Sequence, residues 1–416
     1  MKSILKVFSE EVVGTNYEGY QLNAYNINEK VYNFSPGPAP IPSKILDSLK
    51  EDLNKIYPYG ITPLEISHRS PEFTSILENV NKNMKIFLKI PDTFSIIWTQ
   101  GGGHGQFSAI PLNLKYLFSE NSKANYAVTG TWSERSYKES QKFLNSYNSF
   151  LINDNKLSLS FTEIPSKFNI SDEDEYLYLC SNETVNGIEF RNDGIPYPNR
   201  ESLKNTKLII DMSSDMCMKD INWENIDVAF ACTSKNLGIA GANVVIIRND
   251  LLNKLDEKNK VIPCTLDWNL YNNTKSLYNT PAIFNIYIID KILEYYLSCG
   301  GIEYFEKNSK IKSKLVYDLL DNSNLYKPTI LNKKIRSNIN IPFIVGNGDE
   351  EAKYLFLDFC YKNNIVGLRT KTPFNYKELN IIEPLRISLY NGISVEDTEK
   401  LVKVMKEFEY VYNVTR

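Results

Sequence analysis

The sequence predicts an α/β protein with a mostly parallel β-sheet, helices on both faces of that sheet, and a smaller α+β domain toward the C-terminus. Two observations predict this fold. Short apolar runs, rich in β-branched or small residues, recur with helical or loop segments between them, and each run ends in polar, small or aromatic residues. Beyond Gly300 and Gly301 the composition shifts to a few strand-like runs that stand between amphipathic helices.

The elements follow in chain order. Residues 1–30 are polar, without a clear period, and are expected to be an N-terminal extension. The expected strands of the large sheet are 94–99, 126–129, 176–181, 208–211, 228–232 and 243–248. The expected helices are 72–88, 282–297, 301–320, 350–363 and 395–410, and the expected strands of the small domain are 338–345 and 385–390. The predicted division is an extension (1–30), a large domain (45–295) and a small domain (31–44 and 296–416).

Composition excludes several classes of protein. A net charge of −3 gives no reason to expect nucleic acid or an anionic membrane surface as a partner. No apolar run approaches the roughly 18 residues of a membrane span, and Glu10 and Glu11 come too early for a secretion signal, so we expect a cytoplasmic protein. Six scattered cysteines without a CxxC pair, together with only two histidines, predict neither a disulfide framework nor a metal site.

One stretch carries the clearest chemical signal. Asp211 and Lys235 each follow a predicted buried strand, at the sheet edge where open α/β sheets bind ligands. Desolvation by Cys232, Leu237 and Ile239 would lower the pKa of Lys235 and suit it to form a Schiff base with an aldehyde. Asp211 could keep the pyridine nitrogen of pyridoxal phosphate protonated. Taken alone, the same residues also fit a solvated loop lysine and a helix cap.

Other residues at predicted strand ends fit a cofactor of this kind. The turn Gly101–Gly105 joins a strand to a helix and could present backbone N–H groups to a phosphate, although glycines also serve tight turns. Trp132 could stack on a ring or belong to the core, and Thr184 could hydrogen-bond a ring hydroxyl. Arg386 interrupts an apolar strand, which favours a carboxylate partner, either a structural Asp or Glu or a substrate.

With these residues in view, the chain resembles the phosphoserine aminotransferases from about Tyr32 to its C-terminus. The resemblance rests on motifs that stand in the same order: NFSPGPA, SHRSPEF, GGGHGQFSAIPLN, TGTW, NETVNGI, IDMSS, SKNLGIAG, YNTP and LRISLYN. It implies the aspartate aminotransferase-like fold (fold type I), with a mostly parallel seven-stranded sheet in the large domain. It also implies a homodimer with shared active sites, pyridoxal 5'-phosphate as cofactor, and amino and oxo acids as substrates in serine biosynthesis.

The resemblance also implies roles for residues. Lys235 would form the Schiff base and move the proton between substrate and cofactor, and Asp211 would pair with the pyridinium. The other cofactor-binding residues would be Gly103, His104, Trp132, Thr184 and Ser234, with Asn279 and Thr280 from the partner subunit. Arg386 would bind the α-carboxylate of the substrate, with His68 and Arg69 near its distal end.

The chain departs from the family pattern in places. Ser234 stands where many members have glutamine, His104 occupies a variable position, and the N-terminal extension has no family counterpart. Residues 369–384 lack the His-Arg pair that helps the family to bind the phosphate of its substrate, although Arg369, Lys371 or Lys377 could supply charge. The expected reaction is therefore amino transfer between glutamate/2-oxoglutarate and 3-phosphohydroxypyruvate. The alternative is a related pyridoxal-phosphate enzyme of a specialised pathway that acts on a different oxo or amino acid, with or without a phosphate group.

Overall fold

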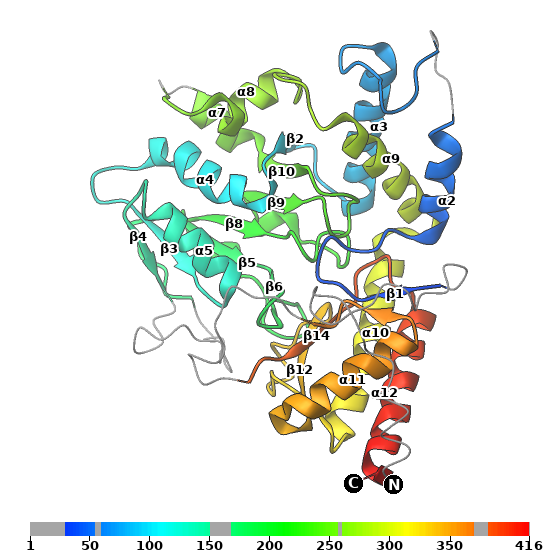
Figure 1. Ribbon diagram of the computed structural model, residues 1–416. Coiled ribbons are helices and arrows are strands. Elements are labelled where there is room, and N and C mark those ends of the chain that lie inside the picture. Colours follow the sequence, from blue (N-terminus) through cyan, green and yellow to red (C-terminus); the bar gives the residue numbers. More distant parts are fainter. Residues whose placement is uncertain (1–29, 55–59, 150–167, 257–259, 370–381, 416) are drawn as a thin grey trace.

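The computed structural model describes residues 30–54, 60–149, 168–256, 260–369 and 382–415 (Figure 1). The predicted N-terminal extension lies outside these residues, except for Lys30, whose ammonium group forms an ion pair with Asp397. None of the helices within the described part of the chain is both long and apolar enough to cross a bilayer.

The centre of the molecule is a seven-stranded sheet with strand order β2-β10-β9-β8-β5-β3-β4. Neighbouring strands from β9 to β4 are parallel, whereas β10 runs antiparallel to both β2 and β9. The strands are β2 (Phe94–Gln100), β3 (Lys123–Ala127), β4 (Ser146–Asn148), β5 (Asp174–Cys180), β8 (Lys207–Asp211), β9 (Val228–Cys232) and β10 (Ala242–Arg248). The predicted seven-stranded, mostly parallel sheet is thus confirmed.

Both faces of the sheet are buried, and alternate residues of each strand enter different cores. In β8, Leu208 and Ile210 belong to one core and Ile209 to the other. Helices α3 (Pro71–Leu88) and α9 (Ile283–Ser298) cover the first face. Helices α4 (Gly102–Leu114), α7 (Asn249–Asp256) and α8 (Trp268–Asn273) cover the second. Burial on both sides explains why these strands read as continuous apolar runs.

A smaller body lies below the sheet in Figure 1. Its antiparallel sheet has the order β11-β12-β14, formed by β11 (Tyr326–Pro328), β12 (Asn340–Val345) and β14 (Leu385–Ser388). It packs with α11 (Glu350–Lys362), α12 (Val395–Thr415) and the second half of α10 (Gly301–Asn322) around a core of its own. Strand β1 (Tyr32–Asn33) pairs with β13 (Ile365–Val366), and Phe34 joins this core. The first described residues therefore pack with the last part of the chain.

The remaining helices and strands are short connections. They are α2 (Ser43–Asp52), α5 (Thr131–Ser140), α6 (Arg200–Leu203), β6 (Asn182–Glu183) and β7 (Ile188–Glu189), with 3-10 helices at Lys115–Leu117, Trp223–Asn225, Cys264–Leu266 and Gly346–Gly348. Strand β4 and helix α5 were not predicted. The expected strand 126–129 begins earlier and ends at Ala127, because residues 128–130 already form the turn that leads into α5.

Candidate active site

A cavity of about 480 Å³ opens at the carboxyl ends of the parallel strands. Strands β5, β8 and β9 end at its floor, the first turns of α4 and α5 form its walls, and β14 supplies one arginine. The predicted site residues that line it are Gly103, His104, Trp132, Thr184, Asp211, Ser234, Lys235 and Arg386. Pro36, Gly37 and Pro38 close the side that faces the smaller body.

Lys235 lies three residues beyond β9, with its Nζ 5.8 Å from the centroid of the Trp132 ring. Burial lowers the pKa of Lys235, but its electrostatic interactions with the neighbouring groups, Tyr390 first and Asp211 among them, raise it by more, so the pKa lies above its ordinary value. The prediction of a lowered pKa is therefore wrong for the protein chain by itself. That prediction considered the apolar residues near Lys235 in the sequence. It did not consider the acidic groups that the fold places beside the Lys235 side chain.

Asp211 is the last residue of β8 and is 4% exposed. Its Oδ1 accepts a hydrogen bond of 2.8 Å from the backbone N–H of Ser213. Burial raises the pKa of Asp211, and Ser213 and Lys235 partly offset that effect. A buried carboxylate at the floor of a cavity favours a ligand that brings a positive charge to it.

The glycine turn gives α4 an open N-terminus. Gly101 (φ 104°) and Gly102 (φ 64°) adopt left-handed backbone conformations, and no side chain caps the helix. The N–H groups of the first helical turn have no partner inside the helix. Since Gly103 and His104 line the cavity, these N–H groups and the positive end of the helix dipole suit an anion there.

Trp132 is fixed at both its backbone and its ring. Glu183 accepts hydrogen bonds from the backbone N–H groups of Trp132 (2.9 Å) and Ser133 (2.8 Å), and thus caps α5. The indole Nε1 of Trp132 donates to Thr184 Oγ1 at 2.6 Å. Burial raises the pKa of Glu183 to about 6. Two adjacent residues of one loop therefore hold the aromatic wall of the cavity.

Arg386 reaches the cavity from β14 and is 5% exposed. One of its guanidinium nitrogens, Nη1, donates to the backbone carbonyl of Thr184 at 2.6 Å. This contact connects the smaller body to the loop that orients Trp132. A guanidinium held in this way can bind a carboxylate that enters the cavity.

Four predicted site residues do not line this cavity. His68 and Arg69 lie in the loop before α3. The side-chain amide of Asn279 donates to Gln100 Oε1, and the side-chain amide of Gln100 donates to the backbone carbonyl of Thr280. Arg369 lies 5.9 Å from the centroid of the Tyr354 ring and is not part of the cavity wall. Lys371 and Lys377, the other possible sources of charge, fall outside the described residues.

The residues present fit the predicted cofactor, pyridoxal phosphate. The open N-terminus of α4 suits its phosphate, the buried carboxylate of Asp211 suits a protonated ring nitrogen, and the amine of Lys235 suits its aldehyde. The indole of Trp132 offers a flat surface for the ring.

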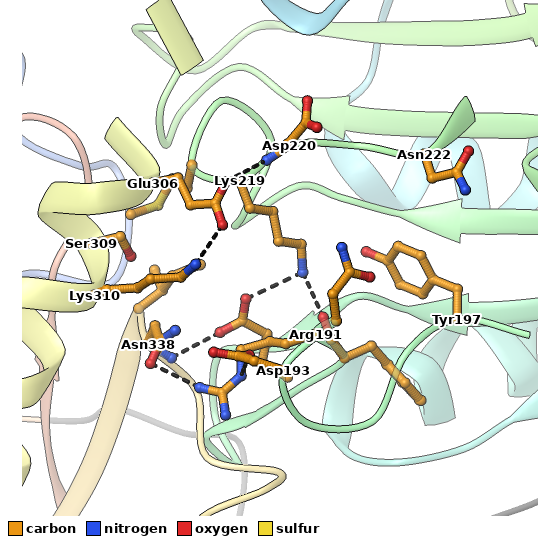
Figure 2. Close-up of a pocket in the computed structure, with 15 residues that line it drawn as sticks. Arg191, Asp193, Tyr197, Lys219, Asp220, Asn222, Glu306, Ser309, Lys310 and Asn338 are labelled. Carbon is orange, nitrogen blue, oxygen red and sulfur yellow. Dashed lines mark hydrogen bonds and ion pairs between the residues drawn. The ribbon is translucent and has the colours of Figure 1, made fainter. Parts of the chain in front are cut away.

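A second pocket, of about 100 Å³, lies between β7, the loop that follows β8, and α10 (Figure 2). Its partly buried lysine, Lys219, already has partners: Asp215 Oδ2 and the Phe190 carbonyl at 2.7 Å, and Glu189 Oε1 at 3.2 Å. At its rim Lys310 pairs with Glu306 at 2.7 Å. The backbone N–H of Asn338, just before β12 of the smaller body, donates to Glu189 Oε2 at 2.8 Å and so joins the two bodies at this pocket. The pocket is too small for a cofactor.

Sequence reasoning missed several residues of the site. Ser213, Arg135 and Tyr390 received no role, although all three are near the cofactor site: Ser213 and Arg135 line the cavity, and Tyr390 influences the pKa of Lys235. Glu183 and Tyr390 stand inside motifs that had been recognised, so only their contacts were lacking. Arg135 has no motif signal, because its place in the cavity depends on an unpredicted helix.

The chain matches the family model for aminotransferase class-V over residues 31–401. It is 34% identical to a probable phosphoserine aminotransferase of Caenorhabditis elegans, with 92% of this chain and 97% of the relative covered. It is 33% identical to a phosphoserine aminotransferase of Ralstonia pickettii, with 92% and 96% covered. Among solved structures, the phosphoserine aminotransferase of Bacillus circulans subsp. alkalophilus superposes with a TM-score of 0.81 at 28% identity, over 92% of this chain and 99% of the other. The pyridoxal-phosphate-bound phosphoserine aminotransferase of Trichomonas vaginalis gives 0.80 at 30% identity, over 91% and 100%.

Proposed function

This chain belongs to the aminotransferase class-V family, and we propose that it transfers an amino group between glutamate/2-oxoglutarate and 3-phosphohydroxypyruvate. It is a pyridoxal-phosphate-dependent transaminase that resembles the phosphoserine aminotransferases along more than nine-tenths of its length. The observation that carries the proposal is the meeting of Lys235, Asp211 and Arg386 in one cavity, although they come from three different strands or strand ends.

Bound pyridoxal phosphate supplies an aldehyde that holds the amino group and a protonated ring that accepts electrons from the reacting carbon. The carboxylate of Asp211 holds the proton on the ring nitrogen, because a buried anion beside that nitrogen favours its protonated form. Lys235 Nζ binds the cofactor in the resting enzyme and moves the proton at the α-carbon of the substrate.

The other residues bind and orient. Among the residues that line the cavity, the N–H groups at Gly103 and His104 and the hydroxyl of Ser234 would hold the cofactor phosphate. Trp132 would offer its indole to the ring, and Thr184 would bind the ring hydroxyl. Arg386 binds the α-carboxylate of the amino or oxo acid, which places the α-carbon near Lys235.

We further propose a homodimer in the cytoplasm. His68, Arg69, Asn279 and Thr280 lie outside the cavity of their own chain, which supports a role in the cavity of a partner subunit. In that arrangement Asn279 and Thr280 would complete the cofactor phosphate site. His68 and Arg69 would reach the distal end of the substrate.

A second candidate is a related transaminase that acts on a non-phosphorylated acid. It is favoured by the sequence of residues 369–384, which lacks the His-Arg pair of the family. Loss of a charged hydrogen bond to phosphate typically removes about 1.5–3 kcal/mol of binding free energy, so a replacement for it is needed if the substrate is phosphorylated.

Half-reactions separate the two candidates. Glutamate would first convert the holoenzyme to the form that carries the amino group on the cofactor. The rate at which the enzyme returns to its aldehyde form would then be measured with 3-phosphohydroxypyruvate and with hydroxypyruvate. We expect a clear preference for the phosphorylated acid; equal rates would favour the second candidate. In parallel, the visible absorbance of the bound cofactor should change in Lys235→Ala, and Asp211→Asn should retain cofactor but react slowly. Failure of the wild-type chain to bind pyridoxal phosphate would contradict both candidates.

A further inference from the structure

We propose that Arg135 binds the phosphate group of the substrate and thereby sets the preference for a phosphorylated oxo acid, an inference that rests on the function proposed above. Arg135 belongs to the second turn of α5 and lines the cavity. Its Cζ lies 5.0 Å from the centroid of the Trp132 ring, which places a guanidinium beside the aromatic wall.

The charge of Arg135 is available for a ligand. The two glutamates nearest to it on α5 are each engaged by a lysine: Glu134 pairs with Lys138 of the same helix at 2.6 Å, and Glu139 pairs with Lys142, just beyond the end of α5. Within the ranges that the structure describes, no ion pair of Arg135 is recorded. A partly buried guanidinium next to a cavity, with its neighbouring carboxylates already occupied, favours an incoming anion.

The cavity contains two guanidinium groups that are connected through a short series of contacts. Arg386 donates to the Thr184 carbonyl, the Thr184 hydroxyl accepts from the Trp132 indole, and Arg135 lies over the Trp132 ring. The proposed substrate carries an anion at each end, a carboxylate and a phosphate monoester. With Arg386 assigned to the carboxylate, Arg135 is the remaining arginine of the cavity wall in the described chain, and the planar guanidinium suits bidentate binding of phosphate.

The phosphate of the cofactor does not need this arginine. It has a separate site at the open N-terminus of α4, with the hydroxyls of Ser213 and Ser234 also on the cavity wall. Arg369, the one described cation of the segment 369–384, lies against Tyr354 instead of in the cavity. Within the described part of the chain, Arg135 therefore offers a positive charge in place of the His-Arg pair that the sequence 369–384 lacks.

The test compares holoenzymes of wild type, Arg135→Ala, Arg135→Lys and the control Lys138→Ala. Lys138→Ala removes a positive charge from the same helix at an exposed position outside the cavity. Each holoenzyme would be assayed with glutamate and either 3-phosphohydroxypyruvate or hydroxypyruvate, and the dissociation constant for pyridoxal phosphate would be measured by absorbance titration. Near-ultraviolet circular dichroism would check the fold of each variant.

We expect Arg135→Ala to raise KM for the phosphorylated acid by about 10- to 100-fold, with a small change in kcat and no change for hydroxypyruvate. Inorganic phosphate should become a weaker competitive inhibitor, Arg135→Lys should recover part of the loss, and Lys138→Ala should behave as wild type. An equal loss with both acids, or weaker pyridoxal phosphate binding with an unchanged preference, would overturn the role of Arg135. A wild-type enzyme without any preference would instead refute the proposed function itself.

Discussion

Thr184 orients Trp132 through a hydrogen bond of 2.6 Å from the indole nitrogen to the threonine hydroxyl. The preceding residue, Glu183, accepts from the backbone N–H of Trp132 at 2.9 Å. Ring and backbone of the aromatic wall are thus held from the same loop, and the same Thr184 accepts from Arg386. One threonine therefore connects Trp132 and Arg386, so the proposed stacking of the cofactor and the proposed binding of the carboxylate would be coupled through it.

Thr184→Val keeps the shape of the side chain but removes the acceptor for the Trp132 indole. Because the partly buried N–H of the Trp132 indole then loses its partner, we expect cofactor binding to weaken by about 1–3 kcal/mol. Titration of the apoenzyme with pyridoxal phosphate measures this change. In a double-mutant cycle with Trp132→Phe the two losses should be non-additive, and simple additivity would show that the hydrogen bond has no role.

Glu183 should make the stability of the protein depend on pH. Burial raises its pKa from 4.5 to about 6, so the folded state holds this proton more tightly than the unfolded state does. The contribution of Glu183 to the free energy of unfolding is therefore greatest below about pH 4.5 and is lost as the pH rises through about 6. The change amounts to about 2 kcal/mol. Urea unfolding of wild type and Glu183→Gln across this range should reveal the difference, whereas parallel pH profiles would contradict it.

Lys312 of α10 is a buried lysine whose Nζ donates to the carbonyls of Leu389, Tyr390 and Ile393, each at 2.9 Å. Lys312→Met would leave these carbonyls without that partner, and we expect faster amide hydrogen exchange in the loop after β14. Lys353→Met is the control. Lys353 lies on α11, its ammonium group pairs with Glu350 and Glu383, and its loss should leave hydrogen exchange in the loop after β14 unchanged.

The same lysine predicts a second pH effect. Burial lowers the pKa of Lys312 to about 7, with Asp397 opposing the shift, so above that pH the unfolded state binds more protons than the folded state. Relative to Lys312→Met, the free energy of unfolding should rise by about 1.4 kcal/mol per pH unit between pH 7 and the ordinary lysine pKa of 10.5. A constant difference between the two proteins would show that the three carbonyls keep the ammonium charged.

Gly130 is required for steric reasons. A Cβ at this position would lie 2.5 Å from Asn186 Oδ1 and 2.7 Å from the Glu183 carboxyl carbon. Asn186 cannot easily retreat, since its Oδ1 accepts from the Thr131 N–H at 2.9 Å. We expect Gly130→Ala to destabilise the protein by about 1–3 kcal/mol in thermal unfolding. Gly105→Ala is the control for the glycine change itself, because its φ is not left-handed and the nearest atom to the added Cβ, the Gln100 carbonyl oxygen, lies at 3.4 Å.

Much of the large sheet could be predicted, because strands buried on both faces leave continuous apolar runs in the sequence. Strand β4 escaped detection because its three residues, Ser146, Tyr147 and Asn148, carry no apolar pattern at the edge of the sheet. The antiparallel direction of β10 was also hidden, since an apolar run has the same composition in either direction.

The cavity was predicted best where a residue follows directly from a strand end, as with Asp211 and Lys235. Contacts between distant segments could not be predicted. Tyr390 raises the pKa of Lys235 from far along the chain, and Arg135 enters the cavity from a helix without an apolar signature. For His68, Arg69, Asn279 and Thr280, a role in this site remains a prediction about a partner subunit.

The pairing of β1 with β13 has a mechanical consequence. Phe34 is anchored in the core of the smaller body, and Pro36, Gly37 and Pro38 follow at once as one side of the cavity. The Tyr390 hydroxyl ties Pro36 to the same body at 2.8 Å. At the other end of this wall, the Ala39 N–H donates to the Ser234 carbonyl at 2.8 Å, and the side chain of Lys235 lies next to Gly37. A rotation of the smaller body would therefore be transmitted through residues 36–39 to the loop that carries Lys235.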